Sequence, residues 1–354
     1  MKTEKYFALA LDPIHIGTGG YRLGRVDNTI VRDPATRLPK IPGTSIEGCC
    51  RTYAYYEEWN CSNGFKKPSS SCASGKENAC GRCRICVTFG YTNAERVKIK
   101  VENEDKEIPE SLHGMAQFSD ARILFFPVYS MLGPVWITCP SVLKEAGIKY
   151  KENRNEKEIP KVLKEEIIPS KELSVVDNRL NLGWILLEQR KENNSYLSLD
   201  FSKLECKDKL LTEVSKEFEE ILKKLVIVSD DIFSQIVNSN LEVRTSVSIN
   251  PETGAAEEGA LFTYEAIPRG TILWFDIVYL PVDKFECYIA CKEKDEEGKE
   301  KGERANLEKH IKPVVKNGLK LFETLGVGGM GTRGFGRLKI LNLGNGGEND
   351  KNKS

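Results

Sequence analysis

Alternation of apolar and polar residues recurs along the chain and predicts β-strands. The predicted strands are 6–11, 29–33, 38–41, 117–127, 135–138, 241–249, 259–265, 271–280, 285–292 and 337–341. Apolar residues at helical spacing predict helices over 44–58, 210–226 and 305–325, and Pro140 is placed to open a further short helix. Because the strands are dispersed among the helices without regular βα alternation, the pattern indicates an α+β core.

Several segments interrupt this pattern within an expected single domain, 1–354. Residues 60–110 are a cysteine-rich insertion, and residues 142–235 are a Lys/Glu-rich insertion that we expect to be helical, with a solvated part at 149–172. The strands within 241–265 form a long hairpin with few large apolar residues at its tip, so it can stand away from the body. Residues 343–354 are expected to be a disordered tail.

Charge and hydropathy restrict the possible functions. The 52 basic and 52 acidic residues give a formal net charge of zero, so any polyanion site must be a local patch. No apolar run approaches the length of a membrane span, and residues 1–5 lead directly into a strand without a signal peptide. We therefore expect a soluble, cytoplasmic protein.

The 11 cysteines of such a protein point to a metal site or free thiols rather than disulfides. Cys80, Cys83 and Cys86 form two overlapping C-x-x-C pairs, and Cys72 or Cys61 can supply a fourth ligand. Thiolates at this spacing favour a structural zinc site. An iron–sulfur cluster is the alternative, although the cysteine-proline that ends the ferredoxin pattern is missing, and unliganded thiols are a third reading.

Two further stretches have chemical potential. Residues 15–51 combine a glycine-rich run with a helix start at Thr44-Ser45, which is preceded by Lys40 and followed by Arg51. This helix start is either a phosphate-binding site or an ordinary capped helix. Thr44 and Glu47 have the spacing of a capping box. Residues 326–331 have a formal G-x-G-x-x-G pattern, but the order helix, glycines, strand excludes a dinucleotide fingerprint.

The first of these stretches resembles the N-terminal signature of RAMP-superfamily CRISPR proteins. Two later stretches, 117–128 and 240–262, look like the Cas7-group backbone subunits of type III-B effector complexes, which cleave target RNA. The resemblance implies an RRM-like (ferredoxin-like) palm with a protruding thumb hairpin at 241–265. The residues that carry the N-terminal match are His15-Ile16-Gly17, Asp27, Lys40-Ile41-Pro42-Gly43-Thr44-Ser45, Gly48 and Arg51.

The resemblance also implies an endoribonuclease site. Asp27 matches the loop aspartate that the family requires for target-RNA cleavage, where a carboxylate can hold Mg²⁺ or Mn²⁺ or orient a ribose 2′-hydroxyl. His15 is either a proton-transfer group or a hydrogen-bond partner of its own loop. The implied partners are guide RNA, complementary target RNA, further copies in a filament and other complex subunits. The implied RNA contacts are Lys40, Thr44, Ser45, Arg51, Arg244, Gly328, Gly329 and Arg333.

Two other functions remain open on the sequence. The chain can be a scaffold that binds RNA without cleaving it, with Asp27 as a turn residue. It can also be a metal-independent endonuclease that matures guide RNA by general acid–base chemistry with His15. Substitution of Asp27 distinguishes the scaffold from a target-RNA nuclease, because only the nuclease should lose cleavage. Substitution of His15 identifies the guide-maturation endonuclease, which should require that residue.

Overall fold

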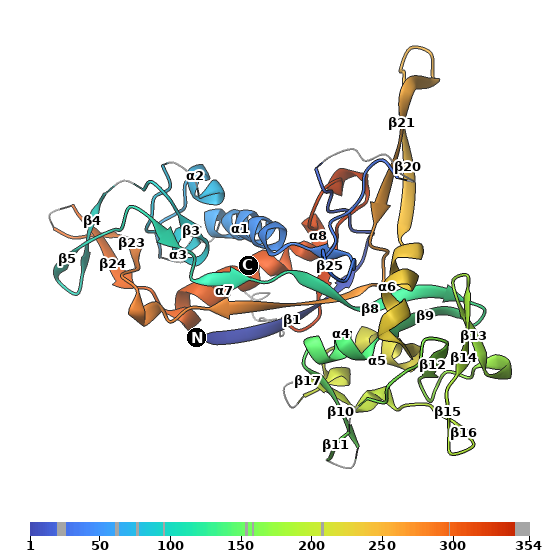
Figure 1. Ribbon diagram of the computed structural model, residues 1–354. Coiled ribbons are helices and arrows are strands. Elements are labelled where there is room, and N and C mark those ends of the chain that lie inside the picture. Colours follow the sequence, from blue (N-terminus) through green and yellow to red (C-terminus); the bar gives the residue numbers. More distant parts are fainter. Residues whose placement is uncertain are drawn as a thin grey trace, which may run out of the picture.

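The computed structural model describes residues 1–19, 26–60, 64–75, 78–94, 96–152, 155–157, 159–206, 209–296 and 298–343. Cys61 and all but the first residue of the expected tail, 343–354, lie outside these residues. The described part is a mixed α+β structure built on an eleven-stranded sheet, from which a long hairpin projects (Figure 1).

Four antiparallel strands at one end of this sheet support the rest of the protein. They lie in the order β25-β1-β22-β8, with Tyr6 of β1 paired with Phe275 of β22. Their bounds are β1 (Lys2–Ala10), β8 (Ala121–Ser130), β22 (Ile272–Tyr279) and β25 (Leu338–Ile340). The predicted strands 6–11, 271–280 and 337–341 are therefore confirmed, whereas 117–127 is divided between β7 (Ala116–Phe118) and β8.

Helices pack on both faces of these strands. Helices α1 and α7 lie together, and they approach so closely that a Cβ on Gly318 of α7 would be 2.4 Å from the carbonyl oxygen of Cys50 on α1. On the other side, Phe218 of α5 makes edge contacts with the rings of Phe7 and Phe125. The helices are α1 (Gly43–Asn60), α2 (Ser70–Ser74), α3 (Arg84–Phe89), α4 (Pro140–Glu145), α5 (Lys216–Lys223), α6 (Asp230–Ser239), α7 (Lys312–Lys320) and α8 (Phe322–Leu325). Among the described residues, no helix has the length and apolar character needed to cross a membrane.

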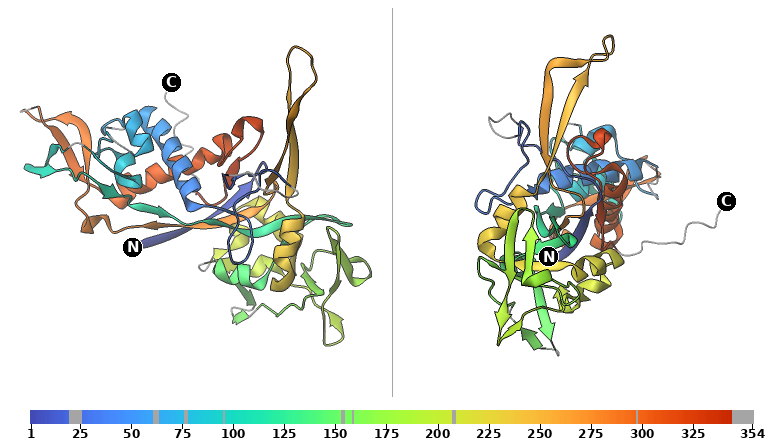
Figure 2. Two further views of the ribbon diagram at one scale, coloured as in Figure 1. Left: turned by 45° about the horizontal axis from the view of Figure 1, so that its top comes forward. Right: turned by 90° about the vertical axis from the view of Figure 1, so that its right-hand side faces the viewer.

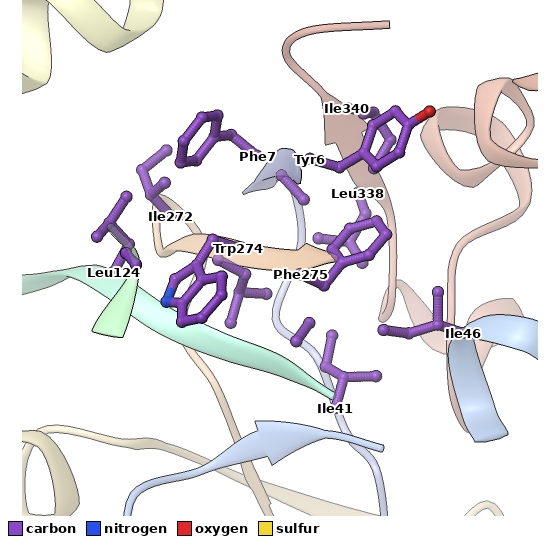
Figure 3. Close-up of a cluster of buried hydrophobic side chains, with 14 of the residues drawn as sticks. Tyr6, Phe7, Ile41, Ile46, Leu124, Ile272, Trp274, Phe275, Leu338 and Ile340 are labelled. Atoms are coloured by element: carbon purple, nitrogen blue, oxygen red, sulfur yellow. The ribbon is translucent and has the colours of Figure 1, made fainter. Parts of the chain in front are cut away.

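Aromatic and aliphatic side chains fill the layer between α1 and the sheet. The rings of Tyr6 and Phe275 stack at 5.6 Å, and Ile46 enters from the first turn of α1 (Figure 3). Each of these side chains is at most 3% exposed. Burial of this kind stabilises the fold by roughly 1.5–3 kcal/mol per large side chain. The core therefore fixes α1 and the strands that carry the loops discussed below.

The start of α1 is capped by a residue distant in sequence. The helix begins at Gly43, whose amide donates to Asp120 Oδ1 at 2.8 Å, and Lys40 Nζ contacts Asp120 Oδ2 at 2.6 Å. The capping box expected from Thr44 and Glu47 is not formed, because Thr44 already lies inside the first turn. Asp120, between β7 and β8, takes that role because the sheet brings it to the helix.

Replacing Asp120 with alanine should lower the free energy of unfolding by about 1 kcal/mol at neutral pH, the usual cost of a lost cap. Burial alone would raise the pKa of Asp120, but the Lys40 ammonium and the Gly43 amide together lower it. The stabilisation is therefore present above the unfolded-state pKa and is lost as the pH falls through the lower folded-state pKa. Urea unfolding at several pH values checks this, and a stability difference that grows below about pH 4 would contradict it.

The segment 142–235 contains more strand than helix, which differs from the predicted helical insertion. Its expected solvated part contains β12 (Glu166–Pro169), and the expected helix 210–226 is reduced to α5 because the apolar run of β19 (Leu225–Val228) is fully buried. β19 pairs with β12 and β9, so this segment extends the main sheet. β9 (Gly133–Thr138) comes just before the segment. The other strands within it are β10 (Ile148–Glu152), β11 (Asn155–Lys157), β13 (Arg179–Leu182), β14 (Ile185–Gln189), β15 (Lys191–Glu192), β16 (Ser195–Tyr196), β17 (Leu204–Cys206) and β18 (Lys209–Leu210).

The cysteine-rich segment forms small sheets around α2 and α3 at the end of the molecule away from the hairpin (Figure 1). A segment distant in sequence joins these sheets, because β24 pairs with both β23 and β4. The strands are β3 (Gly90–Tyr91), β4 (Lys98–Val101), β5 (Glu104–Glu107), β6 (Leu112–His113), β23 (Tyr288–Lys294) and β24 (Glu300–Arg304).

The predicted long hairpin is confirmed as β20 (Glu242–Ile249) and β21 (Ala256–Ala266). It projects far from the sheet, as all views show (Figures 1 and 2). Most side chains of β20 are exposed, including Val247 and Ile249. The foot of β21 is instead buried, with Tyr264 and Ala266 at most 5% exposed.

Candidate functional site at the foot of the hairpin

The loop that carries Asp27 runs beside the foot of β21. The amide of Asn28 donates to the carbonyl of Thr263 at 3.0 Å, and the amide of Glu265 donates to the carbonyl of Asn28 at 3.0 Å. Asn28 and Tyr264 thus form a short parallel bridge. The loop pairs with the edge of β21 that β20 leaves unpaired, and this places Asp27 where the hairpin joins the body.

The carboxylate of Asp27 is held by one residue of the hairpin. Its Oδ2 accepts hydrogen bonds from the amide of Thr263 at 2.8 Å and from the Thr263 hydroxyl at 2.9 Å. These bonds, the backbone one first, lower the pKa of Asp27, so the half-buried carboxylate is ionised at neutral pH. Within the described chain, no hydrogen bond from another residue to Oδ1 is recorded. A fixed, charged oxygen acceptor is therefore available at this position.

His15 approaches the same edge of β21 as the Asp27 loop. Its Nδ1 contacts the carbonyl oxygen of Glu265 at 2.7 Å, so Nδ1 carries a proton, and its ring meets Tyr264 edge-on at 5.7 Å. The side chain is buried, and its Nε2 is 3.1 Å from where a Cβ on Gly17 would stand. The bond goes to the hairpin strand rather than to the backbone of its own loop, and it leaves Nε2 as the nitrogen able to exchange a proton. The catalytic role of His15 stays a prediction.

The C-terminal glycine loop packs against His15. The amide of Gly329 donates to the carbonyl of His15 at 3.0 Å. Gly328 has φ +93°, and a Cβ there would be 2.3 Å from Ile16 Cδ1, so only glycine fits. The exposed Arg333 donates from Nη1 to the Tyr264 hydroxyl at 3.0 Å. The loop therefore reaches the same strand foot as Asp27.

Arg244 completes this group from β20, where it is paired with Tyr264. Its exposed guanidinium lies 4.8 Å from the ring centre of Phe335 and contacts Glu242 Oε1 at 2.5 Å. The structure thus brings together six residues that the sequence singled out separately. They are His15, Asp27, Arg244, Gly328, Gly329 and Arg333.

Glu265 belongs to this site but was missed by the sequence reasoning. Its side chain accepts from Arg32 Nη2 at 2.5 Å and from the amide of Ile30 at 3.3 Å, and the residue is only 8% exposed. Both donors lie just after the Asp27 loop, at residues that form isolated β-bridges. No motif marks Glu265 in the sequence.

The remaining predicted RNA contacts lie elsewhere. Lys40, Thr44 and Ser45 are at the start of α1, where Lys40 is paired with Asp120 and Thr44 is exposed. Arg51 is only 8% exposed, and its guanidinium donates to the carbonyl of Cys72 at 2.8 Å and of Gly90 at 2.8 Å. Arg51 therefore joins α1 to the cysteine-rich segment, and we leave it out of the proposed RNA interface.

Replacing Arg51 with methionine should lower the free energy of unfolding by about 2–4 kcal/mol, because buried carbonyls of Cys72 and Gly90 lose charge-assisted donors. The matched control is Arg179→Met, which removes an exposed arginine paired with Glu188 and should cost about 0.5 kcal/mol or less. Chemical denaturation of both variants measures the difference. Equal effects of the two substitutions would contradict the assigned role of Arg51.

Four cysteines form a compact cluster beside α3. The Sγ atoms of Cys72, Cys80, Cys83 and Cys86 all lie within 4.8 Å of one another, and those of Cys80 and Cys86 are 4.0 Å apart. A tetrahedral zinc with Zn–S bonds of about 2.3 Å places its sulfurs about 3.8 Å apart, so the cluster can hold a metal ion with little adjustment. Of the two candidates for the fourth ligand, Cys72 is in the cluster, and Cys61 lies outside the described residues.

The pKa shifts of these thiols are also consistent with the binding of a cation. Hydrogen bonds from Cys80, Cys83 and Cys86 lower the pKa of Cys72, whereas burial raises the pKa of Cys83. Opposite shifts arise because adjacent buried thiols cannot all ionise without a counter-charge. A bound metal ion supplies that charge, since the thiolate is the ligand form.

Comparison with known proteins identifies the family to which this chain belongs. A family model of the RAMP superfamily matches residues 8–339, and the chain belongs to that superfamily. Among curated relatives, it is 28% identical over 290 residues to the CRISPR system Cmr endoribonuclease Cmr4 of Pyrococcus furiosus, covering 79% of this chain and 83% of that protein. It is also 42% identical over 79 residues to the CRISPR system Cms endoribonuclease Csm3 of Methanothermobacter thermautotrophicus, covering 22% of this chain and 28% of that protein.

Solved structures share the fold over nearly the whole chain. Oligomeric Cmr4 from Pyrococcus furiosus matches with a TM-score of 0.52 and 21% identity, covering 96% of this chain and 98% of that one. A chain of the type III-B Cmr-beta complex bound to cognate target RNA matches with a TM-score of 0.52 and 15% identity, covering 97% of this chain and 98% of that one. At these identities the likeness establishes the fold alone.

Proposed function

We propose that this protein is an endoribonuclease and the backbone subunit of a type III-B CRISPR effector complex, in which it binds guide RNA and cleaves complementary target RNA at regular intervals. The observation that carries the proposal is the ionised Asp27 carboxylate, which has one oxygen available at the foot of the projecting hairpin. Membership of the RAMP superfamily and the similarity to a Cmr endoribonuclease support it.

The proposed RNA interface runs from the start of α1 to the hairpin foot. Arg244 and Arg333 supply exposed guanidinium groups, and the glycine loop 328–329 lets a phosphate approach the backbone. Lys40, Thr44 and Ser45 would contact phosphates near the helix start. Such contacts hold RNA by its backbone, and base pairing between guide and target supplies the sequence specificity.

The strand order β25-β1-β22-β8, with α1 following β1 and α7 preceding β25, supports a ferredoxin-like palm as the platform for this interface. The hairpin β20–β21 would act as the thumb that interrupts the guide–target duplex and displaces a nucleotide. Displacing a base costs a few kcal/mol of stacking and frees the backbone for a new geometry. Copies of the chain stacked along the guide would repeat this arrangement at regular intervals.

The proposed reaction is a transesterification within the target strand. The ribose 2′-oxygen bonds to the adjacent phosphorus, and the bond from phosphorus to the next 5′-oxygen breaks. The 2′-hydroxyl loses its proton, the leaving oxygen gains one, and the products are a 2′,3′-cyclic phosphate and a 5′-hydroxyl. Asp27 Oδ1 would accept and orient the 2′-hydroxyl, and His15 Nε2 is the candidate to move a proton.

A divalent ion is compatible with this site. Asp27 offers one hard oxygen, and Mg²⁺ or Mn²⁺ commonly combines one or two carboxylates with phosphate oxygens and water. In the described part of the chain, the one cluster of three or more candidate ligand residues is the cysteine cluster, so the other ligands at Asp27 would come from RNA and water. The ion would neutralise charge on the phosphate. At the cysteine cluster, we propose a structural zinc.

Cleavage by the complex reconstituted with a defined guide RNA tests the proposal. Labelled complementary RNA should be cut at regularly spaced positions, with cyclic phosphate ends, and a non-complementary RNA of equal length should stay intact. Binding without cutting would leave this chain as an RNA-binding scaffold. Cutting of unpaired guide precursor, lost in His15→Ala and insensitive to EDTA, would make it the guide-maturation nuclease instead.

A further inference from the structure

The backbone amide and carboxylate of Asp27 are bound to the hairpin by a single residue, Thr263. The Thr263 hydroxyl donates to Asp27 Oδ2 at 2.9 Å and accepts from the Asp27 amide at 3.0 Å. The Thr263 amide adds a third bond, to the same Oδ2, at 2.8 Å. Two donors on one oxygen fix the rotation of the carboxylate and leave the other oxygen for substrate.

We propose that Thr263 is a positioning residue for RNA cleavage, which aims the Asp27 carboxylate and makes its position depend on the hairpin. This inference rests on the proposed function. Threonine suits the role because its hydroxyl donates and accepts at once, while its β-branched side chain is favoured in a strand. Valine has nearly the same shape but can do neither, and serine keeps the hydroxyl.

Three consecutive residues at the foot of the hairpin hold the surrounding loops. Thr263 binds Asp27 and Glu265 binds Arg32, just after the Asp27 loop, whereas Tyr264 accepts from Arg333 of the C-terminal glycine loop. A displacement of β21 therefore carries the loop and its carboxylate with it. If the hairpin enters the guide–target duplex, the same movement that opens the duplex also places Asp27. Cleavage is then coupled to correct insertion of the hairpin into the duplex.

The charge state of Asp27 depends on the same contacts. The Thr263 amide and then its hydroxyl lower the pKa of Asp27, so loss of the hydroxyl should move that pKa back toward its ordinary value. The neighbouring titratable and charged groups have partners of their own. They are Arg32 with Glu265, Arg244 with Glu242, Arg333 with Tyr264, and His15 with the Glu265 carbonyl.

The test compares Thr263→Val, Thr263→Ser and the matched control Thr245→Val in the reconstituted complex. Thr245 is an exposed threonine paired directly opposite Thr263 on β20, so the control makes the same change without touching Asp27. Target binding and single-turnover cleavage are measured for each across a range of pH. Asp27→Asn is run alongside, to report on the proposed function separately.

Thr263→Val should bind target normally but cut about tenfold more slowly, which is the scale of one lost hydrogen bond. The pH at which its cleavage rate falls on the acidic side should be higher than in the unmodified protein. Thr263→Ser and Thr245→Val should behave like the unmodified protein. If Thr263→Val cuts with unchanged rate and pH profile while Asp27→Asn is inactive, Thr263 is not a positioning residue although the proposed function stands. If serine fails to restore a rate lost in valine, the role of the hydroxyl is overturned. Full activity of Asp27→Asn would instead remove the proposed function itself.

Discussion

Replacing Asp27 with asparagine should reduce cleavage of a guide-complementary RNA by about 10³-fold, within the range expected when a positioned acid–base group is lost. Asparagine keeps the size of the side chain and can still accept from Thr263, so the loop and the hairpin foot should stay in place. Guide and target binding should therefore be unchanged. Single-turnover cleavage with labelled target, beside a filter-binding assay, measures both quantities.

The control for this substitution is Asp33→Asn, which lies in the turn just after the Asp27 loop. Asp33 Oδ1 accepts from the amides of Ala35 and Thr36, and asparagine preserves that turn. Cleavage should be unaffected there. EDTA should abolish cutting by the unmodified complex if a divalent ion completes the site. Cutting by Asp27→Asn at the normal rate would move the chemistry to another residue or subunit.

Local sequence patterns were sufficient for the parts of the fold that depend on local interactions. β1, β22 and the hairpin β20–β21 follow from alternation and turn residues, and α1 follows from its helical spacing. β12 and β19 could not be predicted in this way. Their Lys/Glu-rich surroundings suggest solvent exposure, whereas their apolar residues are buried inside the main sheet, between β14 and β9. The cap of α1 by Asp120 was not predicted for the same reason, because 77 residues separate Asp120 from Gly43.

The same difference between local patterns and distant contacts applies to the candidate site. The sequence marked Asp27, His15 and the glycine loop individually, through motifs at opposite ends of the chain. It did not mark Thr263 or Glu265, because neither has a local signature, and both matter through contacts some 235 residues away. Arg51 looked like a phosphate contact from its spacing, yet the fold places it against buried carbonyls. Tertiary contacts determine the roles of these residues, so their spacing in the sequence alone cannot predict them.

Loss of the cysteine cluster should have the largest effect on stability. Cys83 is fully buried, and its sulfur also accepts from the Cys86 amide at the start of α3. Cys83→Ser removes one of four ligands, and structural zinc sites commonly contribute about 10 kcal/mol or more to folding. We therefore expect the free energy of unfolding to fall by about 5 kcal/mol or more. Urea denaturation and metal analysis measure stability and zinc content on the same samples.

The effect should extend beyond the cluster, because Arg51 on α1 donates to the carbonyl of Cys72. Loss of metal would release Cys72 and weaken the hold of this segment on α1, so unfolding near Arg51 should follow chelation. Cys139→Ala is the matched control, since Cys139 is also buried but lies outside the cluster. It should keep one zinc per chain and lose only about 1 kcal/mol. Retention of zinc and stability by Cys83→Ser would refute the site, and iron with visible absorbance in place of zinc would identify an iron–sulfur cluster, which thiolates at this spacing can also bind.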